Sequence, residues 1–165
     1  MEKAILYHSE LYLPDDLTER EQLFCNIIRE ADRIEIFRTV AENSWETIYG
    51  YDQVGVLSSK ISDEILAFFD RFELVNRSKC KTPADHFLAH IALVFGLTTS
   101  AAIERCVKQG YVNKLLNTNF SDSVSQRKFA HAKSKVKLYL SHAINLHEIN
   151  PDSGNITDDK QSVFY

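Results

Sequence analysis

A helix-start signal followed by a long apolar stripe constrains the fold of this chain more than any other feature. Thr18 and Glu21 form a T-x-x-E capping box, in which each side chain bonds to the backbone of the other residue. From there to about residue 41, apolar residues recur at helical spacing. The members of this stripe are Leu23, Phe24, Ile27, Ile28, Ala31, Ile34, Phe37, Val40 and Ala41. The pattern predicts a long helix that packs against a core through one broad face.

A second start signal lies at residues 82–85. Thr82 stands at the cap position, Pro83 at the first helical position and Asp85 in the positive first turn. The helix that they begin is strongly apolar and is expected to end at Gly96. Residues 1–8 are expected to be the end of a helix, and further helices are expected over residues 62–74, 100–117 and 121–148, which makes about five helices in all.

Turn-forming residues are scarce. Only 5 Gly and 3 Pro occur among 165 residues, which is too few for a protein of many short strands. The 44% hydrophobic and 25% charged residues are typical of a globular chain of one-domain size. We therefore predict an all-α fold, with one helical domain over residues 1–150 and a flexible tail over residues 151–165.

Cysteine content and charge indicate a soluble cytoplasmic protein. Cys25, Cys80 and Cys106 are odd in number and widely spaced, as expected for reduced thiols. No segment approaches the roughly 20 apolar residues of a membrane span. A net charge of −4 gives no global attraction to nucleic acid or to anionic membranes.

Asp32 lies at the edge of the apolar stripe. Its neighbours one turn away are Ile28 and Ile36, so its carboxylate is partly removed from water. That lost hydration must be recovered through a cation, a metal or hydrogen bonds. A salt bridge to Arg29 or Arg33 and simple surface exposure remain alternatives.

Three stretches around Asp32 resemble a known family. Residues 4–8 read Ala-Ile-Leu-Tyr-His, Leu13 and Pro14 follow, and residues 27–38 read Ile-Ile-Arg-Glu-Ala-Asp-Arg-Ile-Glu-Ile-Phe-Arg. This order resembles the C-terminal stretch of the metal-dependent phosphohydrolases of the HD-domain superfamily, where A-I-x-x-H-N and a short L-P loop precede I-R-D-A-D-K-L-D-I. A looser likeness continues through residues 81–88 and 94–97. The resemblance implies that residues 1–150 are the C-terminal portion of an HD-domain-like helical bundle.

The resemblance also implies roles for four residues. Asp32 matches the final ligand of the H…HD…D metal site, and His8 matches a histidine that in some branches binds a second metal or the substrate phosphate. Arg29 and Arg33 match the basic positions beside the ligand and are expected to support binding of phosphate or substrate. The implied cofactor is a divalent metal ion, which polarises a phosphoester and activates water.

The rest of the metal site is missing from this chain. No His-Asp dipeptide occurs, and Glu30 and Glu35 stand where the family pattern usually has Asp. One Asp and one His are fewer than the roughly three protein ligands of a catalytic metal. We therefore assign no catalytic residue and expect weak or absent metal binding by this chain alone. Because Met1 directly precedes a helix of the family pattern, we also expect a truncated enzyme with an exposed apolar face.

Two weaker motifs have simpler interpretations. Asp85, His86 and His90 could hold a second metal, but a polar strip on a buried helix and helix-start chemistry at Asp85 are favoured. The basic residues of the last helix could contact nucleic acid, but a solvated face is favoured. Those basic residues are Arg127, Lys128, Lys133, Lys135 and Lys137.

Two functions follow as expectations. The first is a portion of a metal-dependent phosphohydrolase that acts on a phosphorylated small molecule or nucleotide and is inactive as this chain alone. The alternative is a non-catalytic helical interaction or regulatory module with an eroded metal site. In both cases a homo-oligomer through the exposed apolar face is a possible assembly, whereas membrane and nucleic-acid partners are not expected.

Overall fold

The protein is helical throughout the part of the chain that the computed structural model describes, which is the backbone of residues 2–149 and the side chains of residues 2–143. No strand occurs within that part, which confirms the all-α prediction. The predicted tail over residues 151–165 lies outside the described residues. The elements are α1 (Glu2–Leu6), α2 (Glu19–Glu42), α3 (Trp45–Tyr49), α4 (Gln53–Ser58), α5 (Asp63–Asp70), the 3-10 helix η1 (Arg77–Lys79), α6 (Pro83–Ala92), the 3-10 helix η2 (Leu93–Gly96), α7 (Ser100–Gln109), α8 (Tyr111–Leu116) and α9 (Ser123–Ile149).

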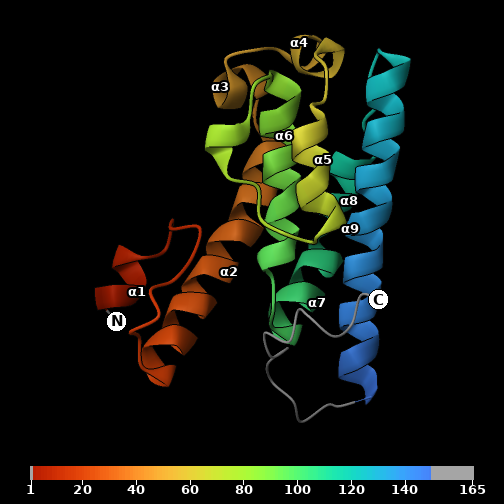
Figure 1. Ribbon diagram of the computed structural model, residues 1–165. Helices are drawn as coiled ribbons and strands as arrows, with labels where there is room; N and C mark the ends of the chain where they lie inside the picture. Colours follow the sequence, from red (N-terminus) through yellow and green to blue (C-terminus); the bar gives the residue numbers. More distant parts are fainter. Residues whose placement is uncertain (1, 150–165) are drawn as a thin grey trace.

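Helix α6 lies at the centre of the helical bundle. Eight of its ten residues are buried. Helix α2 lies on one side of α6, and α5 and α9 lie on the other (Figure 1). Helices α3 and α4 cover one end, and α1 packs chiefly against the first half of α2, away from α9. The long helix α2 therefore joins the N-terminal segment to the rest of the molecule.

Both predicted start signals are confirmed by their hydrogen bonds. At α2 the Glu21 amide donates to Thr18 Oγ1 at 3.3 Å, and the Thr18 amide donates to Glu21 Oε2 at 3.0 Å. At α6 the Asp85 amide donates to Thr82 Oγ1 at 3.1 Å. These contacts satisfy amides that have no partner inside the helix, which is why both helices begin where the sequence indicates.

Two separate apolar clusters stabilise the fold. The large cluster lies around α6, and its largest fully buried side chains include five phenylalanines. These are Phe37, Phe69, Phe87, Phe95 and Phe129. The small cluster holds α1 and the following loop against α2, through Ala4, Leu17 and Cys25. The segment that carries His8 therefore depends on a core of its own.

Several predicted helices end earlier than expected. Gly110 adopts a positive φ of 73° and divides the expected helix over residues 100–117 into α7 and α8. The helix expected to reach residue 74 ends at Asp70, and Phe72 adopts a positive φ of 54°. The apolar run after Pro83 changes from α-helix to η2 at Leu93. Local sequence patterns did not mark the ends at Asp70 and Leu93, because apolar packing continues through them, whereas Gly110 is itself a residue that commonly ends helices.

Two further observations concern the expected environment. None of the described helices is both long enough and apolar enough to cross a membrane. Cys25, Cys80 and Cys106 are all free thiols, as predicted.

Candidate functional site

A small cavity lies between the loop after α1, helix α2 and helix α6, and we call it the α2–α6 pocket. Its volume is about 200 Å³. Three of the four residues that the family resemblance singled out contribute to its lining, namely His8, Asp32 and Arg33. The remaining lining residues are Ser9, Glu10, Leu11, Ile36, Leu74, Arg77, Ala89, His90 and Leu93. Residues from three distant parts of the chain therefore meet in one place.

Asp32 contributes an uncommitted carboxylate to this pocket. It is half-buried on α2, and neither a hydrogen bond nor an ion pair to it occurs within residues 2–143. The expected alternative of a salt bridge to Arg29 or Arg33 is therefore not seen in the described residues. A carboxylate that is partly dehydrated, and whose charge acts on Arg33 without a hydrogen bond or close ion pair to it, is available for a ligand.

Arg33 is fixed by the backbone of η2. Its guanidinium is buried and donates to the carbonyl oxygen of Gly96. A methyl group at residue 96 would lie 2.5 Å from Arg33 Cζ, so only glycine leaves room for the guanidinium there. Burial, together with the nearby charge of Arg29, lowers the pKa of Arg33 to about 10. Arg33 thus remains a cation at neutral pH and contributes a preorganised positive charge.

Arg29 does not line the α2–α6 pocket. Its Nη2 donates to the carbonyl oxygens of Glu10, at 2.9 Å, and Leu11, at 2.7 Å. Burial lowers its pKa, and its Nε has no hydrogen-bond partner within the described residues. The contacts of Arg29 fasten the loop after α1 onto α2. In this structure it therefore positions the wall that carries His8.

His8 lies on the exposed rim of the pocket. Its Nδ1 is 2.7 Å from the carbonyl oxygen of Ile5. A carbonyl only accepts, so Nδ1 carries the proton and donates. The neutral ring therefore has Nε2 free to accept a proton or to bind a ligand, which is the arrangement that orients many metal-binding histidines.

Arg77 and His90 line the opposite wall of the pocket, where the sequence did not predict them. Arg77 of η1 donates through Nη2 to His90 Nε2 at 3.0 Å, and His90 Nδ1 is 2.9 Å from the Tyr49 hydroxyl. Burial, with the charges of Arg77 and His86, lowers the pKa of His90 to about 4. Arg77 was missed because it lies in a single 3-10 turn, which has no periodic pattern to mark it.

Glu30 serves the architecture of the site. It is buried and accepts hydrogen bonds from the amides and hydroxyls of both Thr98 and Thr99. Because Thr99 caps α7, the carboxylate also lies near the positive end of that helix. This contact joins α2 to the segment after Gly96 and so supports Arg33 indirectly.

The described residues do not fit a complete metal site. Among residues 2–143 there is no group of three or more His, Cys, Asp or Glu that could hold a metal ion. His90 is already engaged by Arg77 and Tyr49, and the other possible ligands in the lining, Asp32, His8 and Glu10, do not form such a group. A catalytic metal takes about three protein ligands, which these residues do not supply by themselves.

The weaker motifs have structural roles. Asp85 is fully buried and accepts from the Ser62 amide, the Ser62 hydroxyl and the Lys81 amide. Its oxygens are therefore used inside the fold rather than for a metal. On the basic face of α9, Lys128 pairs with Asp63 at 2.7 Å and Lys135 pairs with Asp70 at 3.0 Å. Part of that face is thus bound to α5.

Comparison of the chain with family models, curated proteins and solved structures found no match.

Proposed function

We propose that the α2–α6 pocket binds the phosphate group of a phosphoester, as one portion of an HD-type metal-dependent phosphohydrolase site. The observation that carries this proposal is that His8, Asp32 and Arg33, which the sequence connects only by resemblance, line one pocket with Arg77. The guanidinium groups of Arg33 and Arg77 would bind the anion, and the carboxylates of Asp32 and Glu10 also line the pocket. Arginine is suited to phosphate because its planar fork can donate two hydrogen bonds at once.

The size of the pocket limits what it would enclose. A volume of about 200 Å³ is below the range of about 300–1,000 Å³ that is usual for whole small-molecule ligands. The pocket would therefore enclose the phosphate and leave the remainder of a phosphorylated small molecule or nucleotide outside. In a complete site of this type, Asp32 and His8 would hold the divalent metal together with ligands from outside the described residues.

The small number of possible metal ligands favours a second candidate function. Because residues 2–143 contain no group of three or more residues that could hold a metal ion, they would bind a phosphate without hydrolysing it. Binding without hydrolysis would be expected of a non-catalytic helical interaction or regulatory module with an eroded metal site. The two candidates share the same pocket and differ in whether phosphate release accompanies binding.

Calorimetric titration with inorganic phosphate and with adenosine monophosphate tests the shared step. Arg77→Ala should weaken binding of both by about tenfold, because a charge-assisted hydrogen bond is lost. The matched control is Arg105→Ala, which should leave affinity unchanged. Arg105 is an exposed residue of α7 that makes no hydrogen bond or ion pair with the described residues. Equal affinities for the two variants, or no binding by the parent protein, would refute the proposal.

Asp32→Asn separates the two candidates. In the absence of metal it should strengthen phosphate binding, because it removes a negative charge from the pocket. Adding Mg²⁺ or Mn²⁺ should increase phosphate affinity in the parent protein but not in this variant, if Asp32 serves as a ligand. Release of phosphate from adenosine monophosphate identifies the hydrolase, and metal-independent binding without release identifies the non-catalytic module.

A further inference from the structure

A second, larger pocket lies at the other end of α2, and we call it the α2–α8 pocket. Its volume is about 720 Å³, which lies within the usual range for small-molecule sites. It is bounded by the C-terminal end of α2, by α3 and α4, and by α8 with the loop that follows it. It shares no lining residue with the α2–α6 pocket, so it is a separate site.

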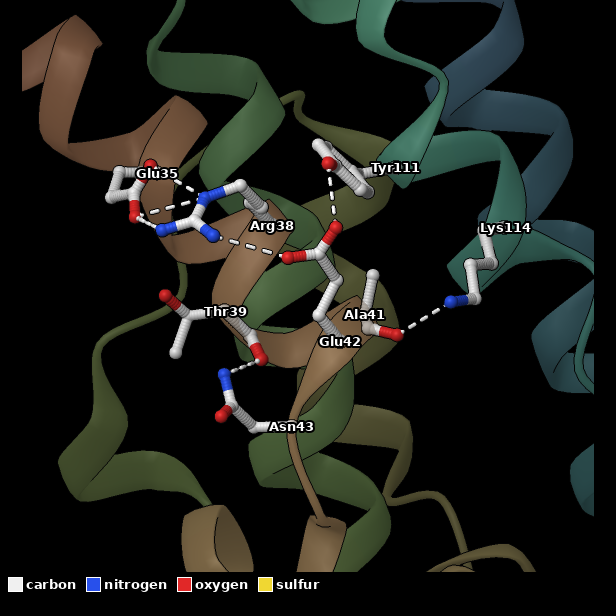
Figure 2. A network of polar contacts seen from close by, with 8 residues as sticks. All are labelled: Glu35, Arg38, Thr39, Ala41, Glu42, Asn43, Tyr111 and Lys114. Atoms are coloured by element: carbon white, nitrogen blue, oxygen red, sulfur yellow. Dashed lines mark hydrogen bonds and ion pairs between the residues drawn. The ribbon is translucent and has the colours of Figure 1, made fainter.

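Hydrogen bonds fix the frame of this pocket. Figure 2 shows Lys114 of α8 donating through Nζ to the carbonyl oxygen of Ala41, at 2.7 Å. On the α2 side, Asn43 Nδ2 donates to the carbonyl oxygen of Thr39 at 2.9 Å (Figure 2). The Tyr111 hydroxyl donates to Glu42 at 2.7 Å, and Glu42 also pairs with Arg38. Helices α2 and α8 are thus held in one relative position, and the pocket between them is preformed.

The polar lining of the pocket is dominated by groups that both donate and accept. Four residues with side-chain amides and two with hydroxyls line it, and some of these groups also bond within the protein. They are Asn43, Gln53, Asn117, Asn119, Ser44 and Thr118. Its charged groups are the carboxylates of Glu46 and Asp52 and the ammonium of Lys114, which is engaged by Ala41. Two carboxylates against one engaged cation disfavour an anion. The lining therefore complements an uncharged ligand that is rich in hydroxyl groups.

An apolar surface accompanies these polar groups. The indole of Trp45 lines the pocket together with Ala41 and Leu115. The indole of Trp45 is held by neighbouring rings, because its centroid lies 4.7 Å from that of Phe87 and 5.8 Å from that of Tyr49. A rigid aromatic surface beside a group of amides matches a sugar, whose ring presents C–H groups on its faces and hydroxyls around its edge.

We propose that the α2–α8 pocket binds a neutral sugar, with Trp45 against the ring and the amides of Gln53 and Asn117 bonded to its hydroxyls. The proposal does not depend on phosphate binding at the α2–α6 pocket. Because the carboxylates of Glu46 and Asp52 repel anions, an unphosphorylated sugar should bind better here than its phosphate ester.

Trp45 is the only tryptophan of the chain, so its fluorescence reports on this pocket directly. Titration of the full chain with glucose, ribose and N-acetylglucosamine should produce a saturable change with at least one of them. Glucose 6-phosphate should bind more weakly than glucose. If none of the three sugars gives a saturable change, or if the phosphate ester binds better than glucose, the proposal is wrong.

Variants locate the binding. Gln53→Ala and Asn117→Ala should each weaken it by about threefold to tenfold, because each removes one set of hydrogen bonds. Asn113→Ala is the matched control, since Asn113 lies on the same helix α8 but outside the lining, and its affinity should equal that of the parent protein. All three positions are exposed, so the fold should be retained, which far-UV circular dichroism checks. Equal affinity in all three variants would place the sugar elsewhere and overturn the assignment.

Discussion

At the scale of single residues, the tautomer of His90 follows from its neighbours. A guanidinium has only donors, so the contact from Arg77 obliges His90 Nε2 to accept. The proton of the neutral ring must then be on Nδ1, which donates to the Tyr49 hydroxyl. A second proton on the ring would leave Arg77 and Nε2 as two donors face to face. The geometry and the lowered pKa of His90 therefore agree.

We predict that His90 makes the fold less stable in mild acid. Its pKa falls from 6.5, the ordinary value, to about 4 in the folded state, so between these values the unfolded chain binds the proton and the folded chain does not. The free energy of unfolding should therefore decrease as pH falls from about 6.5 towards 4, by at most about 3 kcal/mol. Urea denaturation at a series of pH values measures the slope.

The control for this prediction is a pair of histidine variants. His90→Asn should flatten the dependence on pH, whereas His142→Asn, at an exposed position on α9, should keep the slope of the parent protein. A parent protein whose stability is constant across this range would show that His90 does not control it.

The sequence predicted which residues of α2 lie at the α2–α6 pocket better than it predicted how they are held. Asp32 and Arg33 were singled out by the family resemblance, and both line the pocket although adjacent residues of a helix point in different directions. Arg29 was expected beside the ligand, yet it contacts carbonyls 18 and 19 residues away. Contacts at such separations depend on the tertiary fold and leave no local pattern.

At the scale of helices, beginnings were more predictable than ends. The caps at Thr18 and Thr82 involve residues within one turn, so the local sequence contains the whole interaction. The change from α6 to η2 instead coincides with the approach of Arg33 to Gly96, across 63 residues. No single-helix pattern contains that information.

The contact of Glu30 with residues 98 and 99 leads to a prediction about α2 and α7. Glu30→Ala would leave two half-buried amides and two hydroxyls without their acceptor, and we expect the free energy of unfolding to fall by about 2–4 kcal/mol. Glu35→Ala on the same helix removes an exposed ion pair with Arg38 and should change stability by less than about 1 kcal/mol. Urea denaturation followed by circular dichroism compares the two, and similar losses would contradict the role given to Glu30.

At the scale of the whole molecule, apolar exposure is concentrated near the N-terminal end. Five large apolar side chains of α1 and the first half of α2 are between 37% and 64% exposed. They are Ile5, Leu6, Leu23, Phe24 and Ile27. An exposed apolar face was predicted from the family resemblance, and grouped side chains of this kind favour association.

We predict that a second copy of the chain covers this surface at high concentration. Sedimentation should show a weight-average mass that rises with protein concentration. The double variant Leu23→Glu with Ile27→Glu, two positions one turn apart, should remain monomeric, because association would bury both charges. Val124→Glu, at a 47% exposed position on α9, is the control and should still associate. A parent protein that stays monomeric throughout would contradict the prediction.

The division of the apolar residues into two clusters has a consequence for local stability. One wall of the α2–α6 pocket belongs to the large cluster around α6, and the wall that carries His8 depends on the small cluster of Ala4, Leu17 and Cys25. Segments with few buried apolar contacts open at a lower free energy than the rest of a protein. The proposed binding of a phosphate across both walls would therefore require the weaker wall to close. A substitution at Cys25, which touches no ligand, would lower affinity by raising the population of the open form.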